Sequence, residues 1–367
     1  MRRGLHSWLP SVQLLPSCPA LRRAAPRSTS RSVRWTPRRW SWPSPSPRSA
    51  CTWPSEALRS QWAIWWLRSS ARPPDARTEL AILEFRLPRS VAAVLAGAGF
   101  GVAGALTQNV ARNPLASPDV LGVTNGAALG AVSVLAIGVH TGGRSELLVH
   151  YGLPIAATLG GLLVSTLVFA LVWRSSLESN RLVLVGLGFS GLCAALTSWM
   201  LTLGEIYNAQ QALTWLAGTV NAISWADLAI APAIIVPGLI LAMLLRNQRE
   251  VLALDSDTSR ALGMNLGRDR VLLLALASLL AIAATVIAGP LAFVAMASGH
   301  AARLVARGTI PPVPHAALIG AIFVLLADLV AARAFPVILP AGVATAVIGA
   351  PYLIFLVIRQ AKVRQRG

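Results

Sequence analysis

Apolar runs long enough to cross a lipid bilayer recur along this chain, and they restrict its fold more than any other feature. A membrane-spanning helix needs about 20 consecutive apolar residues. The runs are continuous rather than alternating, which argues against a transmembrane β-barrel. The sequence therefore predicts an all-α polytopic membrane protein with about nine recognisable transmembrane helices. The predicted spans are 90–110, 118–139, 152–173, 182–203, 228–245, 271–289, 316–334 and 341–358, with a shorter apolar piece at 291–305.

The composition agrees with a membrane protein, except in the leading segment 1–75. Of the 367 residues, 55% are hydrophobic and 13% charged, with a mean hydropathy of +0.61. Of the net charge of +18, a large part comes from residues 1–75, which hold 13 arginines against Glu56 and Asp75. This Arg-, Trp-, Pro- and Ser-rich segment has no helical or strand period and cannot build a core. We interpret it as disordered or as a wrong-frame start, with a targeting peptide as the alternative.

The arginine distribution predicts the orientation of the spans. Loop 246–270 carries five arginines and the tail 361–367 is basic, so both are expected on the cytoplasmic side. Segment 204–226 has no basic residue and carries aromatic residues suited to an interface, so it should face outward. An even number of crossings must separate loop 246–270 from the tail. The short piece 291–305 is therefore expected to cross the membrane, or nearly so.

The stretch "RLPRSVAAVLAGAGFGVAGALTQNVARNPLASPDVLGVTNGAALGA" combines charge with glycine. Arg86 and Arg89 stand at the outer mouth of the first predicted span, either as interfacial anchors or as a contact site for a partner. Gly97, Gly101 and Gly104 lie within that span, where small residues let another helix approach closely. Helix packing is the favoured role of these glycines.

Sequence patterns for catalysis or metal binding are weak. A P-loop needs a lysine on the phosphates, and the single lysine, Lys362, lies in the tail, so the chain is not its own ATPase of this type. Asp255 and Asp257 form a DxD pair that could hold a divalent ion. We favour a helix N-cap here, with Gly263 at the C-terminal end of the same short helix. The cysteines show no CxxC spacing and indicate neither a disulfide framework nor a zinc site.

Several long blocks resemble one family. The stretch quoted above, together with "LALDSDTSRALGMNLGR", "AGPLAFVAMASGHAARL", "LLADLVAAR" and "LPAGVATAVIGAPYLIFLV" in this order, is similar to the FecCD-type permeases. These are the membrane subunits of ABC importers for ferric siderophores, haem and cobalamin. The resemblance covers about Glu79 to Arg359 and defines a permease domain at 79–360.

The resemblance implies a subunit of a ten-helix fold in the bacterial cytoplasmic membrane, multi-pass, with a cytoplasmic C-terminus. Its expected partners are a cytoplasmic ABC ATPase dimer, an extracytoplasmic substrate-binding protein, a second permease subunit, identical or paralogous, and membrane lipid, with no nucleic acid and no cofactor. The expected cargo is a metal chelate, most often a ferric siderophore. The first of the ten helices should precede the RLPR block, and segment 1–75 contains no such helix, so we expect it to be missing or mistranslated.

The resemblance also implies roles for individual residues. Arg86, Arg89 and Arg333 would face outward and pair with acidic residues of the binding protein. Departures from the family pattern are Gly299 in place of proline before His300, Ile338 before the last "LP", and Arg333 five rather than four residues after Asp328. The residues that would couple to the ATPase are Leu254, Asp255, Ser256, Ser259, Arg260, Leu262 and Gly263.

Two alternatives remain open. An ion-gradient-driven secondary carrier could use the few ionisable groups in the later spans, namely Asp328, Arg333 and His300. Such a carrier would have no need of a capped helical pair at 252–268. The other alternative is an inactive product of a truncated or frameshifted permease gene.

Overall fold

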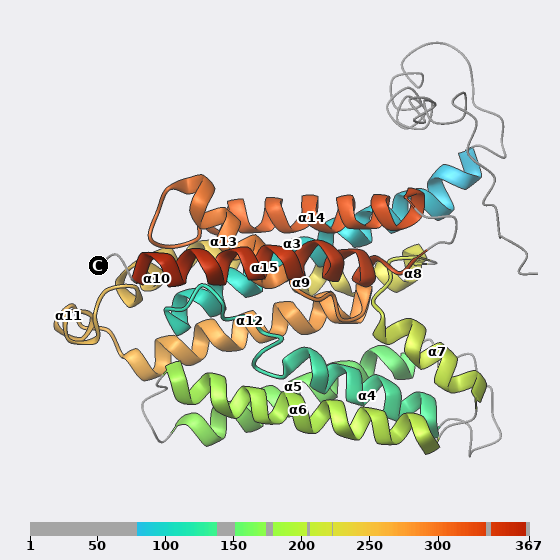
Figure 1. Ribbon diagram of the computed structural model, residues 1–367, viewed down its shortest axis with the longest axis horizontal. Coiled ribbons are helices and arrows are strands. Elements are labelled where there is room, and N and C mark those ends of the chain that lie inside the picture. Colours follow the sequence, from blue (N-terminus) through green and yellow to red (C-terminus); the bar gives the residue numbers. More distant parts are fainter. Residues whose placement is uncertain are drawn as a thin grey trace, which may run out of the picture. The chain divides into compact units, whose positions relative to one another are not determined.

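A computed structural model describes residues 79–137, 151–173, 179–203, 206–221, 223–334 and 339–364. The regular structure of these residues is entirely helical (Figure 1). The predictions for segment 1–75 and for Ile338 fall outside the described residues, as does the end of the basic tail.

Each predicted apolar run overlaps a helix, and the all-α membrane fold is confirmed. Six helices are long and apolar enough to span a bilayer, and α4 and α15 contain shorter apolar stretches. The helices that match the predicted runs are α3 (Leu87–Ala111), α4 (Val123–Ile137), α5 (Leu153–Trp173), α6 (Ser179–Leu203), α9 (Ala231–Leu244), α12 (Leu266–Ala288), α13 (Val294–Ala306), α14 (Val313–Arg333) and α15 (Ala341–Arg364).

Shorter helices occupy the segments between these runs. A π-helical turn, η1 (Ala81–Arg86), leads directly into α3. The segment that was predicted to face outward contains α7 (Ile206–Leu216) and α8 (Trp225–Leu228), and the arginine-rich loop contains α10 (Arg246–Leu252) and α11 (Ser256–Ala261).

The boundary of one predicted span differs from the structure. The run was placed at 118–139, whereas α4 begins only at Val123. Residues 113–122 form turns, and Gly122 adopts φ +79°, a left-handed conformation that a helix does not continue through. Hydropathy alone missed this boundary because the turn itself contains Leu121 and Val120, both apolar.

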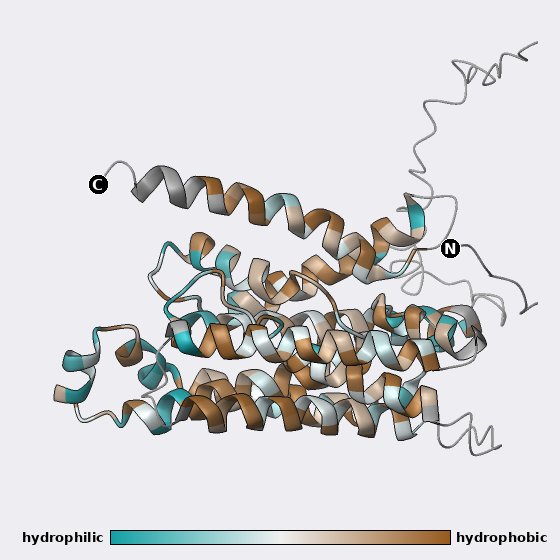
Figure 2. Ribbon diagram, turned by 60° about the horizontal axis from the view of Figure 1, so that its bottom comes forward, coloured by the Kyte–Doolittle hydropathy of each residue, from teal (hydrophilic) through white to brown (hydrophobic). Residues whose placement is uncertain are grey.

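The helices differ in how deeply they are buried. In the span that includes α3, 78% of the most apolar window is buried, whereas in α6 the share is 22%. The helix α12 is also mostly buried, and α5, α9 and α14 are mostly open. The ribbon in Figure 2 is coloured as hydrophobic along much of the long helices, and hydrophilic residues gather at the end where Figure 1 places α10 and α11. Apolar outer surfaces of this kind suit contact with lipid or with other membrane helices.

Two ends of the helical bundle are distinguished by the short helices. The pair α10 and α11 lies at the same end as the C-terminus of α15, whereas α7, α8 and the start of η1 lie at the other (Figure 1). The 13 residues of α13 give a length of about 20 Å, less than the roughly 30 Å of a bilayer core. This helix therefore crosses only part of the membrane thickness.

Candidate functional site

The helices α3 and α14 run antiparallel in close contact through glycine. A Cβ atom on Gly97 would overlap the carbonyl oxygen of Gly320, and one on Gly101 would overlap that of Ala316. Gly104, one turn further along, lies equally close to the backbone of Ala295 in α13. The three glycines thus let the backbones of α14 and α13 approach α3 directly.

A bidentate ion pair joins the same two helices at the end of this contact that lies near η1. Arg89 donates from Nε and Nη2 to the two carboxylate oxygens of Asp328, each at 2.8 Å. The side chains are 27% and 14% exposed, respectively. Planar, two-point pairing is the strongest arrangement that arginine makes with a carboxylate.

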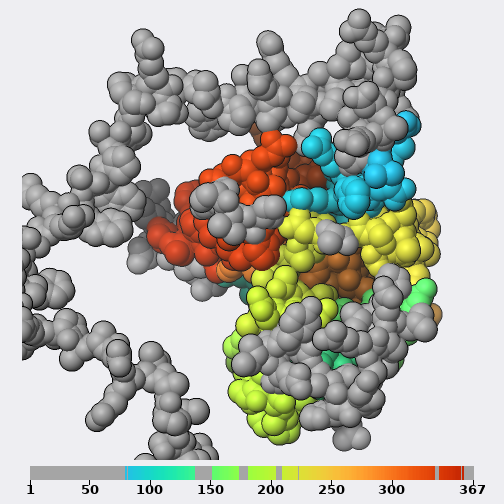
Figure 3. Space-filling model, turned by 90° about the vertical axis from the view of Figure 1, so that its right-hand side faces the viewer, coloured from blue at the N-terminus to red at the C-terminus, as the bar shows by residue number. Residues whose placement is uncertain are grey.

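The other two arginines expected to dock a partner lie at the same end and, unlike Arg89, are exposed. Arg86, at the end of η1, and Arg333, at the end of α14, are both exposed. Figure 3 looks onto this end, where the cyan residues of η1 and α3 adjoin the yellow region of α8 and the orange residues of α14. The structure therefore places all three arginines at one end, with Arg89 already engaged inside the chain.

Sequence reasoning did not find the Arg89–Asp328 pair. The two residues are 239 positions apart, and no local pattern connects them. A signal was nevertheless present, because an ionisable residue inside an apolar span is costly and usually has a partner. Asp328 was noted only as a possible group for a carrier.

At the opposite end, α11 is capped at both termini. The Asp255 carboxylate accepts hydrogen bonds from the Thr258 backbone N–H at 3.1 Å and from the Thr258 hydroxyl at 2.5 Å. These hydrogen bonds hold the pKa of Asp255 below its usual range. After the helix, Gly263 adopts φ +82°, and the Met264 N–H donates to the carbonyl of Ser259. This 6→1 bond with a left-handed glycine is a Schellman motif.

The DxD pair is thus occupied by helix capping and by a surface ion pair. Asp257 lies 3.4 Å from Arg260 across one turn of α11. Across the part of the chain that the structure describes, no group of three or more His, Cys, Asp and Glu side chains could hold a metal ion. The geometry of the pair is that of the favoured capping interpretation.

The residues expected to couple to an ATPase divide into two groups. Leu254 and Leu262 are 44% and 60% exposed, and Arg260 is exposed between them. Ser259 is instead fully buried, and its hydroxyl donates to the carbonyls of Val251 and Asp255, both at 2.8 Å. Ser259 therefore braces α11 against α10, while the exposed side chains offer a surface to a partner.

A buried polar side chain of α3, Gln108, contacts α13. Gln108 donates from Nε2 to the Met296 carbonyl at 2.9 Å, and its Oε1 occupies the place that a side chain on Gly299 would take. The departure from the family's proline at this position therefore leaves α13 unbroken and makes room for Gln108.

Asp119, in the turn before α4, is a half-buried carboxyl group. Burial raises its pKa to about 6, and a hydrogen bond with Thr124 partly offsets this rise.

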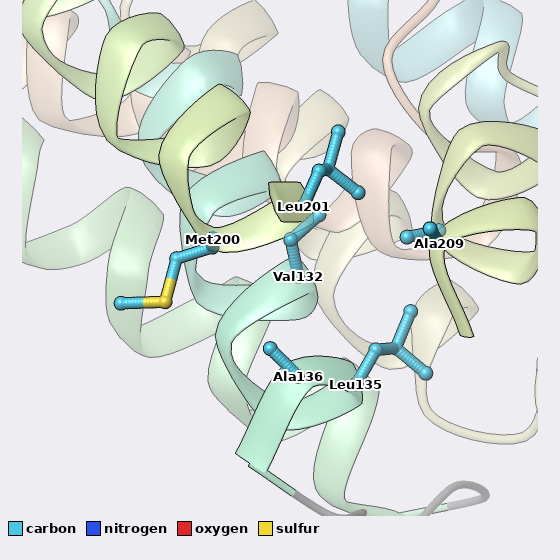
Figure 4. A pocket seen from close by; sticks show the side chains of 7 residues that line it. Val132, Leu135, Ala136, Met200, Leu201 and Ala209 are labelled. Carbon is cyan, nitrogen blue, oxygen red and sulfur yellow. The ribbon is translucent and has the colours of Figure 1, made fainter. Parts of the chain in front are cut away.

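A small crevice between α4, α6 and α7 has only apolar walls. Figure 4 shows Val132 and Leu135 of α4 facing Leu201 and Ala209. A ligand site normally includes a few convergent polar groups that fix orientation. We therefore do not assign a ligand to this crevice.

Comparison with protein families identifies one that covers most of the chain. The model of the FecCD transport family matches residues 58–359. This match begins 21 residues before Glu79, where the resemblance was predicted to start.

Individual relatives have related transport roles. The chain is 36% identical over 314 residues to the ferric enterobactin transport system permease protein FepG of Escherichia coli, covering 82% of this chain and 92% of that protein. It is 38% identical over 317 residues to the achromobactin permease protein CbrC of Dickeya dadantii, covering 84% of each. It is 30% identical over 316 residues to the hemin permease protein HmuU of Yersinia pestis, covering 85% and 88%.

A solved structure shares the fold. It is described as a metal-chelate type ABC transporter in an inward-facing conformation, and it matches with a TM-score of 0.71 and 28% identity. The match covers 83% of this chain and 98% of the other.

Proposed function

Because the chain belongs to the FecCD transport family, we propose that this membrane permease is the membrane-spanning subunit of an ATP-driven importer for a metal chelate. The family and its relatives support a transport role. ATP hydrolysis would come from a partner subunit, since the chain has a single lysine, in its basic tail, and no P-loop.

The observation that carries this proposal is the α10–α11 pair. It is capped at Asp255 and Gly263 and braced by Ser259, and it presents Leu254, Arg260 and Leu262 outward at one end of the bundle. A rigid helix with exposed leucines has no use in an isolated carrier, but it suits a hydrophobic groove on a second protein. We infer that this surface receives the ATPase and that this end, with the C-terminus, lies in the cytoplasm.

The other end would receive an extracytoplasmic binding protein. Arg86 and Arg333 are exposed there, and charges at an interface rim speed encounter and fix register. The Arg89 guanidinium is held by Asp328, so a partner carboxylate would have to displace that pair to reach it. We therefore assign the main docking role to Arg86 and Arg333, with Arg89 chiefly stabilising the helix pair.

The cargo is inferred from the relatives. Their names specify ferric enterobactin, achromobactin and hemin, and the solved structure is of metal-chelate type. A ferric siderophore is the cargo class we favour for this chain. A second permease subunit, identical or paralogous, would complete the membrane pathway in the bacterial cytoplasmic membrane.

The division of the chain is part of the same proposal. Residues 79–360 would form the permease domain with the coupling loop 246–270, and the tail 361–367 would face the cytoplasm. The wrong-frame interpretation of segment 1–75 remains a prediction, and mass spectrometry of the native N-terminus tests it. Peptides recovered from before Pro74 would rule it out.

A secondary carrier remains the second candidate. It would use Asp328 as a titrating group, but that carboxylate accepts two hydrogen bonds from Arg89. The experiment that separates the candidates is affinity capture of the tagged chain from its native membrane, followed by chelate uptake in proteoliposomes with and without ATP. Co-purification of an ATPase and ATP-dependent uptake support the importer. Uptake that follows an ion gradient without ATP would overturn it.

A further inference from the structure

The helix α10 carries one arginine that is buried and one that is exposed. Arg249 is 4% exposed, whereas Arg246, one turn earlier, is exposed and pairs with Glu250 at 2.6 Å. The Nη2 of Arg249 donates to the carbonyl of Pro311. Pro311 lies in the connection between α13 and α14, two residues before Val313, where α14 begins. The Arg249 guanidinium therefore links α10 to the connection that leads into α14.

The same helix is held from the other side by the end of α3. Asn109 donates from Nδ2 to the Arg249 carbonyl at 3.2 Å, and Arg112 donates from Nε and Nη2 to the Leu252 carbonyl at 3.2 and 3.0 Å. Arg112 caps α3 in a left-handed conformation, with φ 48°. The backbone of α10 is thus bound to α3 at two places.

Burial of Arg249 is energetically unfavourable. Burial lowers the pKa of Arg249 to about 10, the carboxylate of Glu250 opposes this shift, and the like charge of Arg246 adds to it. Among the described residues, Arg249 Nε and Asn109 Oδ1 are buried polar atoms without a hydrogen-bond partner. An apolar side chain of similar volume would fill such a site without this penalty. Packing alone therefore does not account for an arginine here.

A buried arginine can fix the relative position of two segments, which apolar contact does not. Apolar surfaces can slide past one another, whereas a hydrogen bond from a buried guanidinium to a backbone carbonyl fixes both distance and angle. Pro311 has no backbone N–H and a fixed φ, so the segment that accepts this bond is itself stiff. Movement of α10 would consequently carry the first turn of α14 with it.

We propose that Arg249 is the positioning residue through which displacement of the α10–α11 pair reaches α14. This rests on the proposed function, in which an ATPase moves the α10–α11 pair. Because Asn109 and Arg112 bind the same helix to α3, and α3 packs along α14 through Gly97 and Gly101, the two long helices move together. The coupling element thus consists of hydrogen bonds at one end of the α3–α14 pair.

The test compares Arg249→Met with Arg246→Met in the full chain, reconstituted in proteoliposomes with its co-purified ATPase and binding protein. Both variants lose one positive charge from α10. For Arg249→Met we expect ATP hydrolysis within about twofold of wild type but uptake of the ferric chelate lowered at least about tenfold. Arg246→Met should change neither. A purely structural role would lower hydrolysis and uptake together.

A second measurement tests the link between α10 and α14 without a transport assay. Spin labels on cysteines at exposed Asn247 in α10 and at exposed His315 in the first turn of α14, with the native cysteines replaced by serine, report the distance between the two helices. In Arg249→Met the distance distribution should broaden, and in Arg246→Met it should not. Where Arg249→Met fails to insert, Arg249→Gln takes its place with the same expectation, because it also removes the guanidinium that donates to Pro311.

The outcomes separate this inference from the proposed function. Unchanged uptake per ATP and an unchanged distance distribution in the Arg249 variant, beside an active wild type, would overturn the role of Arg249 alone. A wild type that captures no ATPase would overturn the importer proposal. The distance measurement still decides in that case whether Arg249 fixes α14 to α10.

Discussion

Arg89 and Asp328 join the start of α3 to the last turns of α14, with two hydrogen bonds of 2.8 Å between side chains 239 residues apart. Both groups are partly shielded from solvent, at 27% and 14% exposure. Removing one partner would leave the other charge poorly solvated, which costs more than loss of the hydrogen bonds alone.

The first prediction concerns this ion pair. Asp328→Asn should lower stability by about 2 kcal/mol, Arg89→Gln by a similar amount, and the double variant by clearly less than the sum. The stability of each variant is measured by thermal unfolding in detergent. Unfolding is followed with a thiol-reactive dye that reacts with Cys193 once this buried residue becomes exposed, in a chain with Cys18 and Cys51 changed to serine. Strictly additive effects would show that the two side chains do not interact.

The second prediction concerns the glycine contacts of α3. Gly97→Ala and Gly101→Ala should each destabilise the protein by about 1–3 kcal/mol, because the added methyl group meets the backbone of α14. Gly191→Ala in α6 is the matched control, since no atom lies within 4 Å of its added Cβ. The control should be neutral or slightly stabilising. Equal effects at all three positions would contradict close contact between α3 and α14.

The third prediction concerns the end of α11. Gly263 has open space around it but a φ of +82°, so even alanine is strained there, by about 1–2 kcal/mol. Gly263→Val should uncouple uptake from ATP hydrolysis by disturbing the exposed surface of α11. Gly267→Ala is the control, since its added Cβ meets only ordinary contacts. If Gly263→Val transports as much chelate per ATP as wild type, the proposal that α11 couples ATP hydrolysis to uptake is wrong.

The fourth prediction is a pH dependence that arises at Asp119. Its folded-state pKa of about 6 lies above the ordinary value of 3.8, so the folded state binds the proton more tightly. Its contribution to stability is therefore full below about pH 4 and is lost as the pH rises through about 6. Asp119→Asn should flatten the fall in unfolding temperature between pH 5 and pH 7.5. The same slope in both proteins would show that Asp119 is not the group responsible.

The fifth prediction concerns the proposed docking of the binding protein at the end that carries Arg86 and Arg333. Arg86→Glu and Arg333→Glu should each slow association with the binding protein by about tenfold at low salt, and by much less at high salt, where the charges are screened. Surface-immobilised permease in nanodiscs allows the rates to be measured. Arg181→Glu, an exposed arginine at the start of α6, controls for the change in net charge. A loss that persists at high salt would point to misfolding instead.

The sequence predicted the helices of this protein well because each one is an apolar run of recognisable length. Even α13, too short for a full span, was predicted as the shorter apolar piece at 291–305. The start of α4 was misplaced, because Val120 and Leu121 extend the apolar run into a turn that Gly122 dictates.

The site was predicted less completely, for a physical reason. Asp255 and Gly263 act on their own helix, so their positions could be inferred from local pattern. The Arg89 ion pair and the hydrogen bond from Arg249 to Pro311 connect distant segments, and nothing near either arginine in the sequence marks its partner. Burial of Arg249 was equally hidden, because its neighbour Arg246 looks the same in the sequence and is exposed.

The three contacts between α3 and α14 impose a matching of lengths. Eight residues separate Arg89 from Gly97, and eight separate Gly320 from Asp328; four more lead from Gly97 to Gly101 and from Ala316 to Gly320. A single inserted residue would turn everything beyond it by about 100° and move the glycine or the ion pair off the shared face. Insertions and deletions in these segments should therefore be tolerated only when both helices change by the same number of residues and that number is close to whole helical turns, as about seven residues are.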